Sequence, residues 1–83
     1  MSKTDQFNLR KLKTINAKII TNAKKTEIVM FDEEKKIFLI SLKEKPKNNA
    51  ANNVLLLLLM KHGATNPKII KGLTSAKKTI TLK

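Results

Sequence analysis

The sequence predicts an α+β fold in which a single helix covers one face of a β-sheet. Several short segments alternate apolar and polar residues, which is the pattern of half-buried strands. One segment instead carries an apolar stripe at helical spacing, made of Ala51, Val54, Leu55, Leu58 and His62. The chain has 83 residues, enough for one domain with a small core. Because one helix cannot cover both faces of a sheet, a two-layer sandwich follows.

The first half of the chain is expected to form strands joined by polar turns. Residues 1–14 are polar and basic, and we expect a tail or a partner-dependent arm there. Residues 15–21 alternate strictly, which predicts a half-buried strand, and residues 26–31 are a candidate short second strand. Residues 36–43 are apolar at both parities, which predicts a strand inside the sheet. The single folded domain is therefore expected over residues 15–83.

The second half is expected to hold the helix, over about residues 50–62, and two further strands. Pro46 prevents continuation of the preceding strand, and Gly63 supplies the left-handed conformation that ends a helix. Residues 68–71 and 78–83 are predicted strands separated by a turn. The predicted order is thus strand, candidate strand, strand, helix, strand, strand.

Composition excludes several kinds of site. The chain has no Cys and one His, which excludes disulfides, zinc–thiolate sites and any site that needs two imidazoles. It has no glycine-rich phosphate loop and no serine-nucleophile motif. Asp32, Glu33 and Glu34 fall together in a stretch typical of a solvated turn. We therefore expect a protein that is not an enzyme and that uses no cofactor or metal.

Charge indicates a nucleic-acid partner. The chain has 18 Lys plus Arg against six Asp plus Glu, a net charge of +12 that suits a phosphate backbone. Arg10 is the only arginine, and lysines favour point contacts with phosphates over bidentate reading of bases. We therefore expect a structural RNA-binding protein, a small component or associated factor of the ribosome that contacts rRNA. Compositional bias toward lysine is the alternative explanation.

A cytoplasmic location is the expectation for this chain. Residues 1–14 contain polar residues where a signal peptide needs an apolar core. The longest apolar run, residues 54–60, falls far short of the roughly 20 residues that span a bilayer.

The helix is expected to carry a second apolar face. Leu56, Leu57 and Met60 fall largely outside the core-facing stripe, and an uncovered patch of this kind marks an interface. Residues 1–14 folding back are the alternative cover. The second hypothesis for function is therefore a protein-interaction module whose basic surface serves only solubility. Salt separates the two hypotheses, because phosphate contacts weaken steeply with salt and apolar contacts do not.

A series of residues follows the order and spacing of a known family: Ala23, Pro46, Ala51, Asn52, Gly72, Thr74, Ser75, Lys77 and Lys78. In these residues the chain resembles the YggU-like family of small uncharacterised proteins, the domain of unknown function 167, over about residues 15–83. Thr21 and Asn22 replace the family's Pro-Gly, Asn49 replaces its Gly before Ala-Asn, and the family usually continues into a second helix where this sequence stops. The resemblance implies a two-layer α+β fold with a mixed four-stranded sheet (β-β-α-β-β) and no settled activity.

The resemblance also implies that the helix start and the loop between the last two strands lie near one another. Helix N–H groups, lysines, hydroxyls and Gly72 would together form an anion site there. The alternative is a simple helix cap at Asn48 or Asn49 and a simple turn at Gly72. The residues expected to contact RNA, including those of the tail, are Arg10, Lys11, Lys13, Lys45, Lys47, Asn52, Lys71, Ser75, Lys77 and Lys78.

Overall fold

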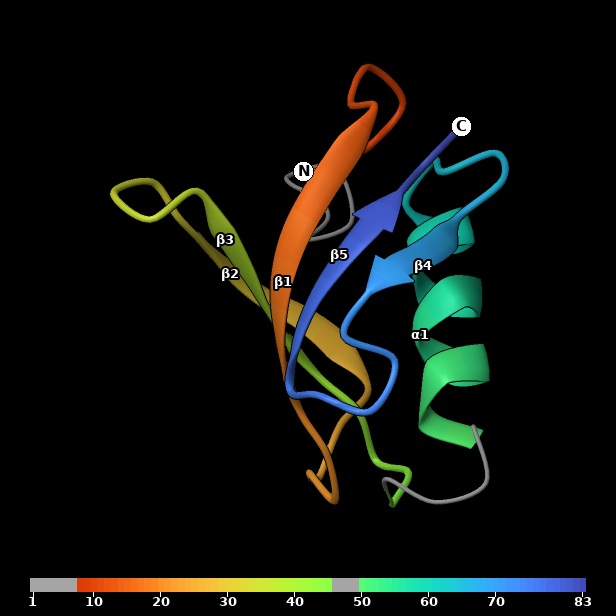
Figure 1. The fold of residues 1–83 in the computed structure, drawn as a ribbon. Helices are drawn as coiled ribbons and strands as arrows, with labels where there is room; N and C mark the ends of the chain where they lie inside the picture. Colours follow the sequence, from red (N-terminus) through yellow and green to blue (C-terminus); the bar gives the residue numbers. More distant parts are fainter. Residues whose placement is uncertain (1–7, 46–49) are drawn as a thin grey trace.

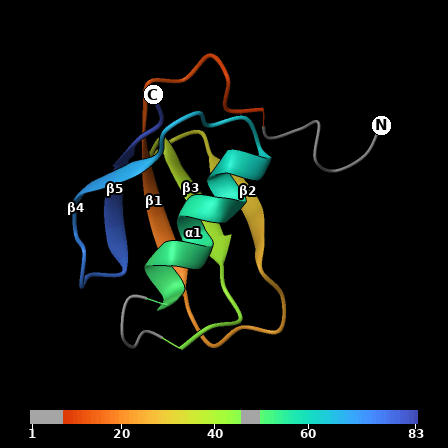
Figure 2. The same cartoon turned by 90° about the vertical axis from the view of Figure 1, so that its right-hand side faces the viewer.

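The computed structural model describes residues 8–45 and 50–83. A mixed sheet in the strand order β2-β3-β1-β5-β4 is covered on one face by the helix (Figures 1 and 2). The predicted α+β fold with two layers is therefore confirmed. Its elements, in chain order, are β1 (Thr14–Ile20), β2 (Glu27–Asp32), β3 (Ile37–Ser41), α1 (Ala50–Lys61), β4 (Lys68–Lys71) and β5 (Lys77–Thr81).

The sheet has five strands, and the four-stranded sheet that the resemblance implied is wrong. The candidate strand at residues 26–31 is a real one, β2, which pairs antiparallel with β3 at the edge of the sheet. Its register shifts between Ile28 and Met30, so Val29 forms a bulge. The bulge changes the phase of the alternation and leaves Val29 and Met30 exposed. That phase change hides the period-two pattern by which the other strands are recognised.

Strand β1 lies at the centre of the sheet, parallel to β3 and antiparallel to β5. Its strict alternation buries Ile15, Ala17 and Ile19 and exposes the residues between them. The strand predicted to lie inside the sheet, β3, is flanked by β2 and β1. The sheet therefore has one apolar face under α1 and one face open to solvent.

The helix packs on this apolar face as predicted, with a small rotation. Phe38, Ile40 and Leu42 are buried on the sheet side. Leu59, outside the predicted stripe, is buried, and His62 is only partly buried. The buried residues of α1 are Ala51, Leu55, Leu58 and Leu59. Among the residues that the structure describes, no helix has the length and apolar character to cross a membrane.

Residues 8–13, within the segment expected to be a tail, pack at the C-terminal end of α1. The Leu9 side chain is 1% exposed, and its N–H donates to the His62 carbonyl at 2.8 Å. The Leu12 N–H donates to the Leu9 carbonyl at 3.1 Å and closes a turn. Leu9 belongs to the hydrophobic core, so the packed chain extends beyond the boundary expected at residue 15.

Candidate nucleic-acid interface

Acidic and basic side chains occupy different parts of the fold. Within residues 8–45 and 50–83, every Asp and Glu lies between Glu27 and Glu44, on or beside β2 and β3. Residues 8–26 and 50–83 contain no Asp or Glu, and we call them the acid-free half. They form β1, α1, β4 and β5. Their cations are Arg10, Lys11, Lys13, Lys18, Lys24, Lys25, Lys61, Lys68, Lys71, Lys77, Lys78 and Lys83.

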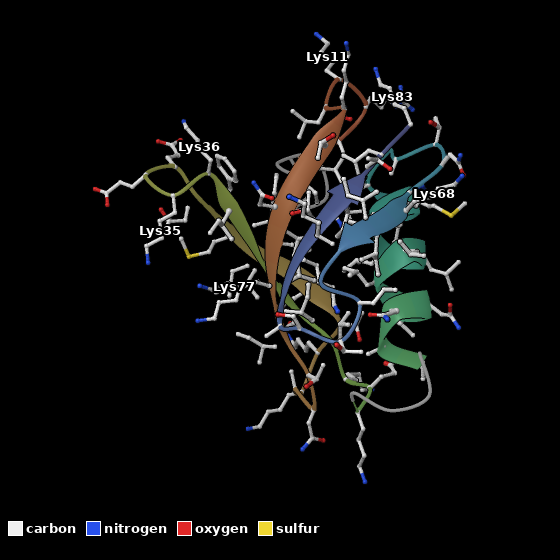
Figure 3. The ribbon with its side chains drawn as sticks, viewed as in Figure 1. Lys11, Lys35, Lys36, Lys68, Lys77 and Lys83 are labelled. Atoms are coloured by element: carbon white, nitrogen blue, oxygen red, sulfur yellow. The ribbon has the colours of Figure 1, made fainter. Side chains whose placement is uncertain are left out.

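The open face of the sheet within this half is polar and basic. Strand pairing places its side chains in rows that cross β1, β5 and β4. Lys77 lies on the side of the sheet away from α1 (Figure 3). We call the following residues the open basic face: Thr14, Thr81 and Lys68 in one row, Asn16, Thr79 and Lys71 in the next, and Lys18 and Lys77 in the third.

Hydrogen bonds hold parts of the open basic face in place. The Thr79 hydroxyl donates to Oδ1 of Asn16 at 2.9 Å, which fixes the orientation of the Asn16 amide. The Thr81 hydroxyl donates to the Lys68 carbonyl at 3.4 Å. These bonds cross between neighbouring strands, so the donors sit on a rigid frame.

Lys18 and Lys77 are directly opposite each other on β1 and β5, and both are exposed. Like charges at opposed positions of an antiparallel pair destabilise a sheet. Neither strand carries an Asp or Glu that would offset the repulsion. An anion placed over the pair would interact favourably with both ammonium groups. The open basic face therefore has the electrostatics of a phosphate-binding surface.

The remainder of the open face, on β3 and β2, is apolar at its centre, with Asp32 and Glu27 at the two ends of β2. Leu39 pairs with Lys18 of β1 on one side and with Met30 of β2 on the other. Ile20 at the end of β1 and Met30 are 44% and 46% exposed. The boundary between the basic and apolar parts therefore runs along β1 and β3.

The loop between β4 and β5 lies beside the first turn of α1, as the resemblance implied. The Asn52 side-chain amide donates to the Leu73 carbonyl at 3.1 Å. The Ser75 hydroxyl accepts the Lys77 N–H at 3.1 Å. Both polar side chains thus hold the loop, whereas Lys71 and Lys77 at its two ends are exposed.

Lys78 is wrongly predicted as a phosphate contact. Its side chain is 7% exposed, because its position on β5 opposite Ala17 faces the core side of the sheet. The ammonium donates to the Gly72 carbonyl at 2.8 Å and to the Leu73 carbonyl at 3.0 Å. Lys78 therefore holds the β4–β5 loop from beneath. Burial lowers the pKa of Lys78 from its ordinary 10.5.

We expect the free energy of unfolding to rise with pH between the lowered pKa of Lys78 and 10.5. In that interval the unfolded chain binds more protons at this residue than the folded protein does, so deprotonation favours folding. A neutral amine retains two N–H groups, enough for both carbonyls. Urea denaturation at increasing pH should show a smaller rise for Lys78→Met than for exposed Lys77→Met. Equal rises in the two variants would contradict the assignment.

The remaining predicted contacts are more widely distributed. Arg10, Lys11 and Lys13 are exposed beside the start of β1. Lys11 and Lys83 project at the same end of the molecule (Figure 3). Lys45 is exposed, and Lys47 lies outside the described residues. The sequence interpretation missed Lys18 and Lys68. Both alternate with apolar residues of a strand, and this pattern could have indicated that they face solvent.

The exposed face of α1 is smaller than predicted. Leu57 and Met60 are 64% and 50% exposed, as expected. Leu56 is partly buried and packs against the core, so its placement outside the packed surface is wrong. The uncovered apolar surface of the helix is thus centred on Leu57 and Met60.

No protein-family model matches this chain, and no curated protein does either. Within the described residues, no group of three or more His, Asp or Glu side chains is placed to hold a metal ion. The charge and geometry of the acid-free half are therefore the features of this chain that bear on its function.

Proposed function

We propose that this protein is a non-catalytic RNA-binding protein that contacts the phosphate backbone through lysines of its acid-free half. The observation that carries the proposal is the segregation of charge. A compositional bias toward lysine adds cations everywhere, but it does not remove Asp and Glu from residues 8–26 and 50–83. The exposed Lys18–Lys77 pair adds a site where two cations face one ligand.

A small component or associated factor of the ribosome is the setting that this charge pattern fits best. Lysines and hydroxyls recognise a folded RNA through its backbone, and Arg10 is the only arginine available for bidentate base contacts. Exposed cations beside the start of β1 extend the basic surface past the end of this central strand. An RNA-embedded location in the cytoplasm follows from these features as part of the same proposal.

Membership of the YggU-like family belongs to this proposal. Asn22 stands where the family has Gly and adopts a φ of 55°, in the left-handed region that Asn tolerates. The closeness of the β4–β5 loop to the helix start, through Asn52 and Leu73, also supports it.

The test is RNA association across a salt series. Replacing Lys18, Lys68 and Lys77 with Gln is expected to flatten the log–log salt dependence by about 2–3 units, at about 0.7–0.9 unit per lost phosphate contact. The matched control replaces Lys35, Lys36 and Lys43 with Gln. These lysines lie among the acidic residues, and their replacement removes the same charge. The control slope should change little.

Two outcomes would overturn the proposal. Equal flattening in both triple variants would mean that RNA responds only to net charge and not to the acid-free half. No RNA association at low salt would contradict RNA binding itself.

A second candidate function is a protein-interaction module, favoured by the exposure of Leu57 and Met60 on α1. Apolar association of this kind is insensitive to salt or strengthened by it. Replacing Leu57 and Met60 with Gln would then abolish an association that persists at high salt, whereas the lysine variants would not.

A further inference from the structure

We propose that the open basic face binds double-helical RNA along its sugar–phosphate backbone, an inference that rests on the proposed function. The face is defined above by three rows of side chains on β1, β5 and β4.

The open basic face carries no aromatic side chain. Proteins that bind single-stranded RNA stack unpaired bases on aromatic rings. The sequence has no Trp or Tyr, and its three Phe are Phe7, Phe31 and Phe38. Phe31 and Phe38 pair across β2 and β3 with ring centroids 4.7 Å apart, and both belong to the packed side of the sheet. Phe7 lies outside the described residues. Among the described residues, unpaired bases therefore find no aromatic stacking partner on this face.

The donors of the open basic face suit a duplex backbone. A-form RNA has a wide, shallow minor groove that displays 2′-hydroxyls and phosphates. The face offers four ammonium groups for phosphates, on Lys18, Lys68, Lys71 and Lys77, together with hydroxyl and amide groups for 2′-hydroxyls. Three strands span about 10 Å across, and the five residues Thr14–Lys18 of β1 span about 13 Å. The strands fix where the four lysines are anchored, and their flexible side chains can reach phosphates spread over three strands.

The Lys18–Lys77 pair indicates where the backbone crosses. These two lysines are Cα partners in the row nearest the β4–β5 loop, and repulsion between their charges disfavours the free sheet. A phosphate between them removes that repulsion. Replacing the pair should therefore weaken RNA binding. Because the repulsion is also removed, the free protein should be at least as stable as the parent. A purely structural role would instead lower stability.

The test uses the full chain and a fluorescent RNA duplex of about 16 base pairs, the length that a double-strand-binding domain contacts. Its separated single strands and a DNA duplex of the same sequence are the comparison probes. We expect the RNA duplex to bind at least about tenfold more tightly than either strand, and more tightly than DNA. Lys18→Thr with Lys77→Thr should lower duplex affinity at least about tenfold without lowering the melting temperature.

The matched control is Lys35→Thr with Lys43→Thr, two exposed lysines that lie among the acidic residues, outside the acid-free half and the open basic face. It removes the same charge and should leave duplex affinity within about threefold of the parent. An equal loss in the control would overturn the assignment to this face.

Tighter binding of single strands than of duplex would overturn the duplex inference and leave the proposed RNA-binding function standing. Equal binding of DNA and RNA duplexes would overturn recognition of the 2′-hydroxyls. Failure to bind any of these probes at low salt would overturn the inference and the proposed function together.

Discussion

Replacing Leu59 with Ala is expected to lower the free energy of unfolding by about 2–5 kcal/mol, the range for truncation of a buried Leu. The Leu59 side chain is 0% exposed and lies in the core between α1 and the sheet. Truncation leaves a cavity that a well-packed core fills only partly. Because small domains have a total stability of about 5–15 kcal/mol, the loss should be evident in urea denaturation followed by far-UV circular dichroism.

Leu57→Ala is the matched control, since Leu57 lies two residues away on the same helix and is 64% exposed. Its expected change is below about 0.5 kcal/mol. A cost at Leu59 no larger than the cost at Leu57 would mean that α1 presents a different face to the sheet.

The packed face of α1 illustrates how far the sequence predicts this fold. The apolar stripe and Gly63 were sufficient to place the helix and its end, and Gly63 indeed has a φ of 114°. They were not sufficient to fix its rotation, because residues 55–59 are all Leu. A run of Leu supplies an apolar side chain in every direction, so several rotations bury similar area. Contact with the sheet decides among them and selects Leu59 over His62.

The strands show the same limit. Strict alternation identified β1, whereas β2 was only a candidate because its bulge at Val29 breaks the period. Leu9 was assigned to a tail because nothing in a short polar segment indicates that one Leu will pack on the end of a distant helix. Bulges and long-range contacts depend on the partner strand or helix, which the local pattern does not contain.

The candidate site was partly predictable. Lys78 shares the parity of Ile80 and Leu82 in the last strand, so its position on the packed side could be read from the alternation. The row of Lys18 and Lys77 could not be predicted from the sequence, because it depends on which strand pairs with β1 and in which register. Residues far apart in sequence become one surface only when the strand order is known.

Replacing Gly72 with Ala is expected to lower the free energy of unfolding by about 1–3 kcal/mol, the range for overpacking a filled site. Gly72 has a φ of 79°, where a side chain is strained. A Cβ there would also collide with the Lys77 carbonyl oxygen across the β4–β5 hairpin. Backbone cannot move aside as a flexible side chain does, so the loop must open. Thermal denaturation of the variant measures the cost.

Gly63→Ala is the comparison, because Gly63 also has a positive φ, of 114°, but a Cβ there meets Cγ of Arg10 at 2.8 Å and the Arg10 backbone nitrogen at 3.2 Å rather than a carbonyl oxygen at colliding distance. Gly72→Ala should cost more than Gly63→Ala because of the collision, although the φ of Gly63 lies further from the left-handed region that Ala tolerates. An equal or smaller cost at Gly72 would show that the loop yields easily. Because Lys71 and Lys77 flank this loop and Lys78 donates to the Gly72 carbonyl, opening it should also displace two lysines of the open basic face. RNA affinity should therefore fall at temperatures where the variant is still fully folded.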